Sequence, residues 1–296
     1  MKNKGFSYAI IGCVFWGLSG IFAQTLFTKF NVQAPWLVGV RLLSAGSLLV
    51  IWSLIVISKQ QWQTFLRKKN IIELMMFALF GVIPSQLTYL LAIQYGNAST
   101  ATILQFTGPL FIILYLCLRN WVLPRRIDVI SLIIALLGTV LVVTNGNLTE
   151  LSLSLPACFW GIMAGVSQTS YTLLPRRLLR EFDARIVIGL AMIVGGIFFI
   201  PVLIFIPAPQ LTLAALFDLS CVVVIGTMFS YLFYLQSLKF IPPETTGMLS
   251  AFEPLTATLL SILWLHQNLG VGELIGACLI ISTTFLQSLA VKLQRV

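Results

Sequence analysis

Charge is what this sequence has least of. Only 9% of its 296 residues are charged, whereas soluble domains carry roughly a quarter, and the mean hydropathy is +0.99. No soluble fold of this length needs so little charge. In hydrocarbon every backbone polar group must be bonded internally, which for apolar runs of this kind means helices. The composition therefore predicts an all-α integral membrane protein.

Motifs for catalysis and for metal binding are also lacking. The five cysteines sit singly in apolar runs, without CxxC or metal-ligand spacing, and are predicted to be small core residues. The sequence contains no HExxH, GxSxG, paired intramembrane aspartates or phosphate loop. We therefore expect no enzymatic activity, no cofactor, no metal site and no transport driven by nucleotide hydrolysis in this chain.

Uncharged stretches recur along the chain, most of them close to the roughly 20 residues that one membrane crossing needs. The run from Leu74 to Leu118 is too long for one crossing, so it must turn back near Gly96 and Asn97. The stretches predict ten transmembrane helices, at residues 6–27, 35–57, 71–94, 98–118, 127–145, 154–174, 185–206, 213–238, 244–265 and 271–290.

The net charge of +9 is explained by where the basic residues lie. With a cytoplasmic N-terminus and ten crossings, 16 basic residues fall on the cytoplasmic side, Lys29 falls outside and Arg41 lies within the second helix. This distribution predicts cytoplasmic termini and a bacterial cytoplasmic membrane. It also removes the need for a nucleic-acid partner.

The chain contains an internal repeat. A shift of 145 residues aligns Tyr89 with Tyr234 and Pro109 with Pro254, and a shift of 144 aligns Phe15-Trp16-Gly17 with Phe159-Trp160-Gly161. Five helices per half is an odd number, so halves 1–147 and 148–296 are predicted to be inverted repeats. Such halves suit alternating access, although a duplication can also merely stabilise a bundle.

With these features in view, the chain resembles the EamA branch of the drug/metabolite transporter (DMT) superfamily. The residues that carry the resemblance are Phe15-Trp16-Gly17, Arg41-Leu42-Leu43, the turn from Tyr89 to Ala98, and Glu253-Pro254-Leu255. The resemblance implies a five-plus-five helix fold and a central cavity lined mainly by the first four helices of each half. The Gly-Glu that members often carry after the fourth and ninth helices is absent here, where the sequence reads Leu118-Arg119-Asn120 and His266-Gln267-Asn268.

Glu253 is the main site candidate, because ionisable groups deep in a membrane are functional by default. It is expected about 13 Å into the ninth helix, directly before Pro254, which permits a kink. A small, polar stripe containing Ser250 and Glu253 should face the cavity. Glu253 is predicted either to contact a cationic group of the substrate or to carry the coupling proton. A protonated acid bonded to a neighbouring helix is the alternative.

Further candidates are amides at membrane depth and aromatic residues placed in repeat-related pairs, each of which has a purely structural alternative. These candidates are Gln24, Gln168, Gln105, Trp16, Trp160, Tyr89 and Tyr234. Arg41 is expected to extend to the headgroups instead, with a direct role in anion binding as the alternative. Gly272-x-x-x-Gly276 permits close helix packing, within the chain or in a homodimer, so monomer and homodimer both stay open.

Together these patterns predict a secondary transporter for a small polar or amphipathic metabolite, such as an amino acid, an amine or a drug-like compound, with protons as a candidate coupling ion. A membrane channel and a membrane-embedded enzyme are the alternatives. Saturable counterflow, conductance and product formation would distinguish the three.

Overall fold

The computed structural model describes residues 2–121, 123, 126–147, 152–210, 212–237, 240–241, 246 and 249–293, and this part of the chain is helical without strands. The first half contains α1 (Lys2–Phe30), α2 (Ala34–Val56), α3 (Lys59–Phe65), α4 (Lys68–Phe77), the π-helical segment η1 (Ala78–Val82), α5 (Ile83–Tyr95), α6 (Ala98–Gln105), α7 (Gly108–Asn120) and α8 (Arg126–Thr144). The second contains α9 (Leu155–Leu173), α10 (Arg176–Glu181), α11 (Ala184–Phe198), α12 (Ile200–Phe205), α13 (Leu213–Ser220), the π-helical segment η2 (Cys221–Phe229), α14 (Ser230–Ser237), α16 (Phe252–Leu263) and α17 (Val271–Leu293).

Several helices have the length and composition of membrane spans. In the described residues, four are both long and apolar enough to cross a bilayer: Asn3–Phe30, Ala34–Val56, Lys68–Tyr95 and Leu213–Ser237. Shorter apolar helices occupy parts of other predicted spans. The expectation of an all-helical membrane protein is therefore confirmed at this level. Residues 244, 245, 247 and 248 of the ninth predicted span lie outside the described residues.

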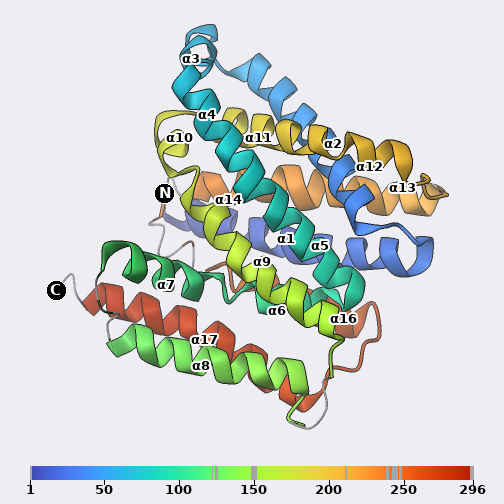
Figure 1. The fold of residues 1–296 in the computed structure, drawn as a ribbon, viewed down its shortest axis with the longest axis vertical. Helices are drawn as coiled ribbons and strands as arrows, with labels where there is room; N and C mark the ends of the chain where they lie inside the picture. Colours follow the sequence, from blue (N-terminus) through green and yellow to red (C-terminus); the bar gives the residue numbers. More distant parts are fainter. Residues whose placement is uncertain are drawn as a thin grey trace.

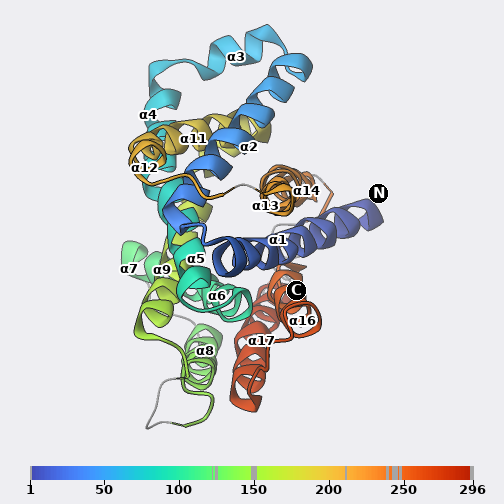
Figure 2. The same ribbon diagram turned by 90° about the vertical axis from the view of Figure 1, so that its right-hand side faces the viewer.

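Helices of the two halves pack against each other in a reciprocal pattern (Figures 1 and 2). At the repeat offset, α2 faces its own counterpart α11, and α8 faces its own counterpart α17. The contact of α1 with α14 corresponds to that of α9 with α5, and the contact of α1 with α16 corresponds to that of α9 with α6. Exchanging the halves thus leaves this set of helix contacts unchanged.

The glycine motif on α17 packs within the chain. A Cβ on Gly276 would lie 2.5 Å from the carbonyl oxygen of Gly138 in α8, and one on Gly272 would lie 2.4 Å from the backbone of Asn145. Figure 1 shows α8 and α17 side by side along their lengths. The small-residue face therefore serves the α8–α17 contact, and using the same face for a homodimer would require this pair to separate.

Gly276→Leu is expected to destabilise the protein by about 1–3 kcal/mol, since the added side chain overpacks a backbone contact. A thermal melt in detergent micelles measures the loss. Ser282→Leu, on the exposed face of the same helix, is the control and should melt near the wild-type temperature. Equal melting of Gly276→Leu and the wild type would contradict the close packing of α8 and α17.

Three predicted spans are interrupted rather than continuous, and one of them, 185–206, breaks at Phe199 between α11 and α12. The segment predicted as one helix over 98–118 breaks at Phe106 and Thr107, and α7 then starts with Gly108 and Pro109. The segment predicted over 244–265 has a turn at residues 250–251, so Glu253 lies in the first turn of α16. Glu253 was expected about nine residues into this helix with a kink at Pro254, whereas the break at residues 250–251 places it in the first turn of a separate helix. Pro254 explains the break, because proline has no N–H to donate within a helix. It is therefore favoured in the first turn of a new helix, where that N–H would have no intrahelical partner.

Candidate functional site

A cavity lies where helices of both halves meet. Its first-half lining residues are Trp16, Arg41, Ser85, Gln86, Tyr89 and Gln105. Its second-half lining residues are Gln168, Tyr171, Tyr231 and Glu253. Among the described residues, none of α8 or α17 lines the cavity, as the family resemblance implied for the fifth and tenth helices. With a volume of about 40 Å³ against the 10–15 Å³ needed for one water, it has room for about three waters.

Glu253 reaches the cavity from a helix start. It sits in the first turn of α16, where the positive end of the helix dipole stabilises a carboxylate. The repeat-related position in the first half is Gly108, at the start of α7. Interrupted helices whose N-termini face the middle of a bundle are a known arrangement for substrate and ion sites in carriers. The interruption therefore places the carboxylate toward the interface between the halves.

Arg41 lines the same cavity, which the sequence did not predict. Only 3% of it is exposed, so the expectation that it extends to the headgroups was wrong. Its Nε donates a hydrogen bond to Thr227 Oγ1 and its Nη2 donates one, 3.2 Å long, to the carbonyl oxygen of Gly226. Both acceptors lie in η2 of the opposite half. A π-helical turn of this kind often marks a functional site.

Two glutamines in the lining have polar atoms without a partner in the described part of the chain. These are Gln86 Oε1 and Gln105 Oε1, both buried. Gln86 is held by its other end, since its Nε2 donates to Tyr231 Oη over 2.7 Å. Buried polar atoms without a protein partner are normally satisfied by water or ligand. The lining thus offers two amide oxygens that can accept hydrogen bonds from water or a polar ligand.

The repeat-related glutamines Gln24 and Gln168 have different surroundings. Gln24 Oε1 accepts a hydrogen bond of 2.8 Å from the backbone N–H of Ala98 at the start of α6, away from the cavity. The residue 145 positions after Ala98 is Pro243, which has no N–H to donate. The corresponding contact is therefore unavailable to Gln168, whose side chain lines the cavity instead.

Aromatic rings form one connected cluster around the cavity. Trp16 meets Tyr231 edge-on with ring centroids 5.0 Å apart, and Tyr231 meets Tyr171 at 5.8 Å. Tyr89 is fixed by a hydrogen bond of 3.2 Å between its hydroxyl and that of Thr102. Such rings present both apolar faces and hydroxyl groups to an occupant.

The nine predicted site residues thus divide into two groups. Five of them line the cavity: Glu253, Gln168, Gln105, Trp16 and Tyr89. The other four do not: Gln24 binds the start of α6, Tyr234 packs on Trp16 at 5.0 Å, Trp160 packs on Phe159 at 4.9 Å, and Ser250 lies in the turn before α16. The lining residues that the prediction missed are Arg41, Ser85, Gln86, Tyr171 and Tyr231. Substrate contact by any of them stays a prediction.

In the polar stripe predicted on the ninth helix, Thr246, Ala257 and Ser261 are buried, and the backbone at Glu253 and Ala257 packs against α1. A Cβ on Gly17 would lie 2.6 Å from the carbonyl oxygen of Glu253 and 3.0 Å from the backbone nitrogen of Ala257. Within the stripe only Glu253 belongs to the cavity lining. The close approach of α1 therefore fixes the backbone that carries the carboxylate.

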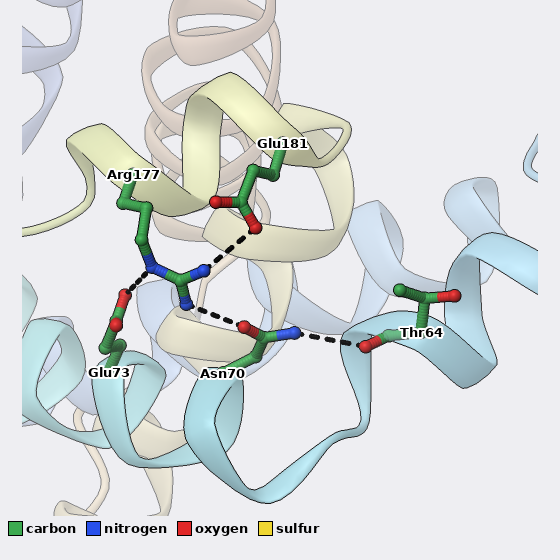
Figure 3. A network of polar contacts seen from close by, with 5 residues as sticks. All are labelled: Thr64, Asn70, Glu73, Arg177 and Glu181. Atoms are coloured by element: carbon green, nitrogen blue, oxygen red, sulfur yellow. Dashed lines mark hydrogen bonds and ion pairs between the residues drawn. The ribbon is translucent and has the colours of Figure 1, made fainter.

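A second polar cluster joins the halves outside the cavity (Figure 3). Arg177 of α10 donates to Glu73 over 2.6 Å, to Glu181 over 2.8 Å and to Asn70 over 2.6 Å. Asn70 in turn donates to the carbonyl oxygen of Thr64. The hydrogen bond with Glu73 is the chief reason that the pKa of Arg177 lies above its ordinary value, so the guanidinium stays charged.

A helical bundle with membrane-length apolar helices and a polar cavity between related halves defines a membrane transporter. The chain belongs to the EamA-like transporter family, whose sequence profile matches residues 3–144 and 155–289. This membership confirms the resemblance seen in the sequence and the expectation that the chain is not an enzyme.

Similar proteins are also named as membrane transporters. The chain is 34% identical over 292 residues to the uncharacterized inner membrane transporter YicL of Salmonella typhimurium, which covers 97% of this chain and 96% of the relative. It is 25% identical over 273 residues to the threonine/homoserine exporter RhtA of the same species, covering 91% and 86%. A solved crystal structure superposes with a TM-score of 0.64 at 16% identity, over 98% of this chain and 96% of the other, which shows a shared fold.

Proposed function

We propose that the protein is a secondary transporter that moves a small polar or amphipathic metabolite by alternating access. The observation that carries the proposal is the cavity, because its lining comes from both halves of a duplicated chain. Two related halves that exchange conformations can open a site between them first to one side and then to the other. In this proposal Glu253 carries a coupling proton or contacts a cationic group of the substrate.

The proposed topology has ten crossings in two inverted halves, residues 1–147 and 148–296, with both termini in the cytoplasm. The reciprocal helix contacts support the duplication, and the distribution of basic residues supports the orientation. The small cavity volume fits a closed conformation, since space for a few waters is too little for a metabolite. Substrate entry then requires the halves to move apart on one side.

The substrate class is proposed to include amino acids, amines and drug-like compounds. RhtA, with which most of the chain aligns, is by name a threonine/homoserine exporter, and this favours amino acids among the three. Proteoliposomes that contain the purified protein test the proposal. Saturable counterflow is expected for a carrier, whereas ionic conductance without saturation would indicate a channel and would contradict it.

The two repeat-related glutamines provide a matched pair of variants. Gln24→Leu leaves the buried N–H of Ala98 without an acceptor and should cost about 1–3 kcal/mol of stability, with substrate preference unchanged. Gln168→Leu should melt near the wild type but lose counterflow. Thermal melts and counterflow on both variants measure this, and equal transport losses in the two would contradict the assignment of different roles.

The Arg177 cluster should hold the halves together on the cytoplasmic side of the proposed topology. Arg177→Gln is expected to speed hydrogen exchange in α10 and in the first turn of α4, and to change the rate of counterflow without changing substrate preference. Arg176→Gln is the control, because Arg176 is exposed and makes no recorded side-chain bond in the described part of the chain. Exchange that is the same in Arg177→Gln and the wild type would show that the cluster does not hold this closure.

A further inference from the structure

We propose that the cavity binds a zwitterion, with the ligand's carboxylate on Arg41 and its ammonium group on Glu253, so that one ligand bridges the two halves. This inference rests on the proposed transport function and narrows its substrate to compounds that carry both charges. It assigns a carboxylate subsite to a residue that the sequence had placed at the membrane surface.

The first observation is the free hydrogen-bonding capacity of Arg41. A guanidinium has five N–H donors, and two of them are used by Thr227 and Gly226. In the described residues no acceptor is recorded for the other three. A buried positive charge of this kind needs a negative partner, and the planar guanidinium matches a carboxylate particularly well.

The second observation is that the natural partner, Glu253, does not take this place. Both residues line the cavity, Arg41 from the first half and Glu253 from the second. Even so, the described part of the chain records no ion pair within 4.0 Å that involves either side chain. Two opposite charges therefore line one small cavity without direct contact, so each can take a partner from a ligand when the cavity opens.

The charge balance of the lining selects the ligand. Arg41 and Glu253 are its two charged members, so the lining is neutral as a whole. A purely anionic ligand would satisfy Arg41 but bring a second negative charge beside Glu253. A purely cationic ligand would satisfy Glu253 but bring a second positive charge beside Arg41. A zwitterion satisfies both and leaves the occupied cavity neutral. An α-amino acid carries its ammonium and carboxylate groups on the same carbon, so one small ligand can reach both side chains once the halves have moved apart enough to admit it.

The remaining lining suits the rest of such a ligand. The unpartnered oxygens of Gln86 and Gln105 can accept the further hydrogen bonds that an ammonium group donates. The rings of Trp16, Tyr171 and Tyr231 offer faces to the ammonium group and apolar surface to a side chain.

The repeat shows that each half supplies one charge and lacks the other. Across the α2–α11 contact, Gly39 and Gly46 correspond to Gly189 and Gly196, a shift of 150 residues that relates Arg41 to Ala191. Glu253 in turn corresponds to Gly108. The carboxylate subsite therefore belongs to the first half and the ammonium subsite to the second. A bound zwitterion thus connects the halves whose relative movement opens the cavity.

Ligands with one charge removed test the proposal. The probes are L-threonine, L-leucine and L-phenylalanine, each with its carboxamide, which lacks the carboxylate, and its N-acetyl derivative, which lacks the ammonium group. Isothermal titration calorimetry on the purified protein gives the affinities, and counterflow in proteoliposomes gives transport. At least one free amino acid should bind about tenfold or more tightly than either blocked form, as expected for one charge-assisted bond.

Two variants assign the subsites. Arg41→Gln should weaken the free amino acid about tenfold and leave the carboxamide unchanged, whereas Glu253→Gln should weaken the free amino acid and leave the N-acetyl derivative unchanged. Arg41→Lys keeps the charge without the planar fork and should retain the preference for the zwitterion at lower affinity. If Arg41→Gln does not elute from size-exclusion chromatography as a single folded species, Arg41→Lys is used in its place to test the carboxylate subsite.

The outcomes separate the two proposals. Equal wild-type affinity for a free amino acid and its carboxamide, or no binding of any free amino acid, overturns the zwitterion site. If the zwitterion site is overturned in this way but a singly charged compound shows saturable counterflow, the proposal that the protein is a carrier still holds. Absence of saturable counterflow for every compound in a broad metabolite panel overturns the carrier function itself.

Discussion

Glu253→Gln is expected to lower counterflow about tenfold or more, because it removes the carboxylate that is proposed to hold the ammonium group of the ligand or the coupling proton. The substitution is nearly isosteric, so the fold should be retained. If Glu253 carries the coupling proton, the dependence of flux on pH should disappear as well. Counterflow measured in proteoliposomes over a range of pH values gives both quantities.

Glu273→Gln is the matched control for this variant. Glu273 is another glutamate of the second half; it is buried, with 8% of its surface exposed, and it accepts hydrogen bonds from Ser152 and from the N–H of Gly270 at the start of α17. It should lower stability and leave the pH dependence of transport intact. Transport by Glu253→Gln with the rate and pH dependence of the wild type would remove Glu253 from the mechanism.

Gly226→Ala is expected to be strongly damaging, because the added methyl group has no space. The added Cβ would lie 2.1 Å from the Cβ and the Oγ of Ser19 on α1, a separation that atoms cannot adopt. Relieving it must displace α1 from η2, and with it the carbonyl oxygen of Gly226 that orients Arg41. We expect a loss of about 1–3 kcal/mol of stability from overpacking together with loss of transport.

A second substitution at Ser19 can remove the atoms that the added methyl group of Gly226→Ala would overlap. Ser19→Gly removes the Cβ and Oγ that the new methyl group meets, so the double variant Ser19→Gly/Gly226→Ala should recover much of the stability lost by Gly226→Ala alone. A double-mutant cycle of thermal melts measures the coupling between the two positions. Additive losses would show that α1 and η2 are not in contact there.

Sequence patterns were enough for the helical membrane class and for the membership of the family, because hydropathy and duplication are properties of whole segments. They failed for Arg41. The number of residues from the helix end gives its depth but not the direction of its side chain. Its acceptors Thr227 and Gly226 lie in the other half, and no local pattern signals a hydrogen bond over such a sequence separation.

The repeat was a good guide to the fold and a poorer guide to the site. Equivalence suggested that Gln24 and Gln168, or Trp16 and Trp160, share a role, yet one member of each pair lines the cavity and the other does not. For the glutamines the cause was visible in the sequence, since Pro243 replaces the N–H donor that Ala98 supplies. Tyr171 and Tyr231 had no repeat-related signal of this kind.

The pairing of α8 with α17 has a consequence for the making of the protein. Residues of α8 leave the ribosome long before those of α17, which ends the described chain at Leu293. Until then the face of α8 around Gly138 has no partner and must remain against lipid or the insertion machinery. Closure of this outer pair therefore has to wait for the synthesis of α17, and a nascent chain that stops before residue 271 leaves that face of α8 without its partner.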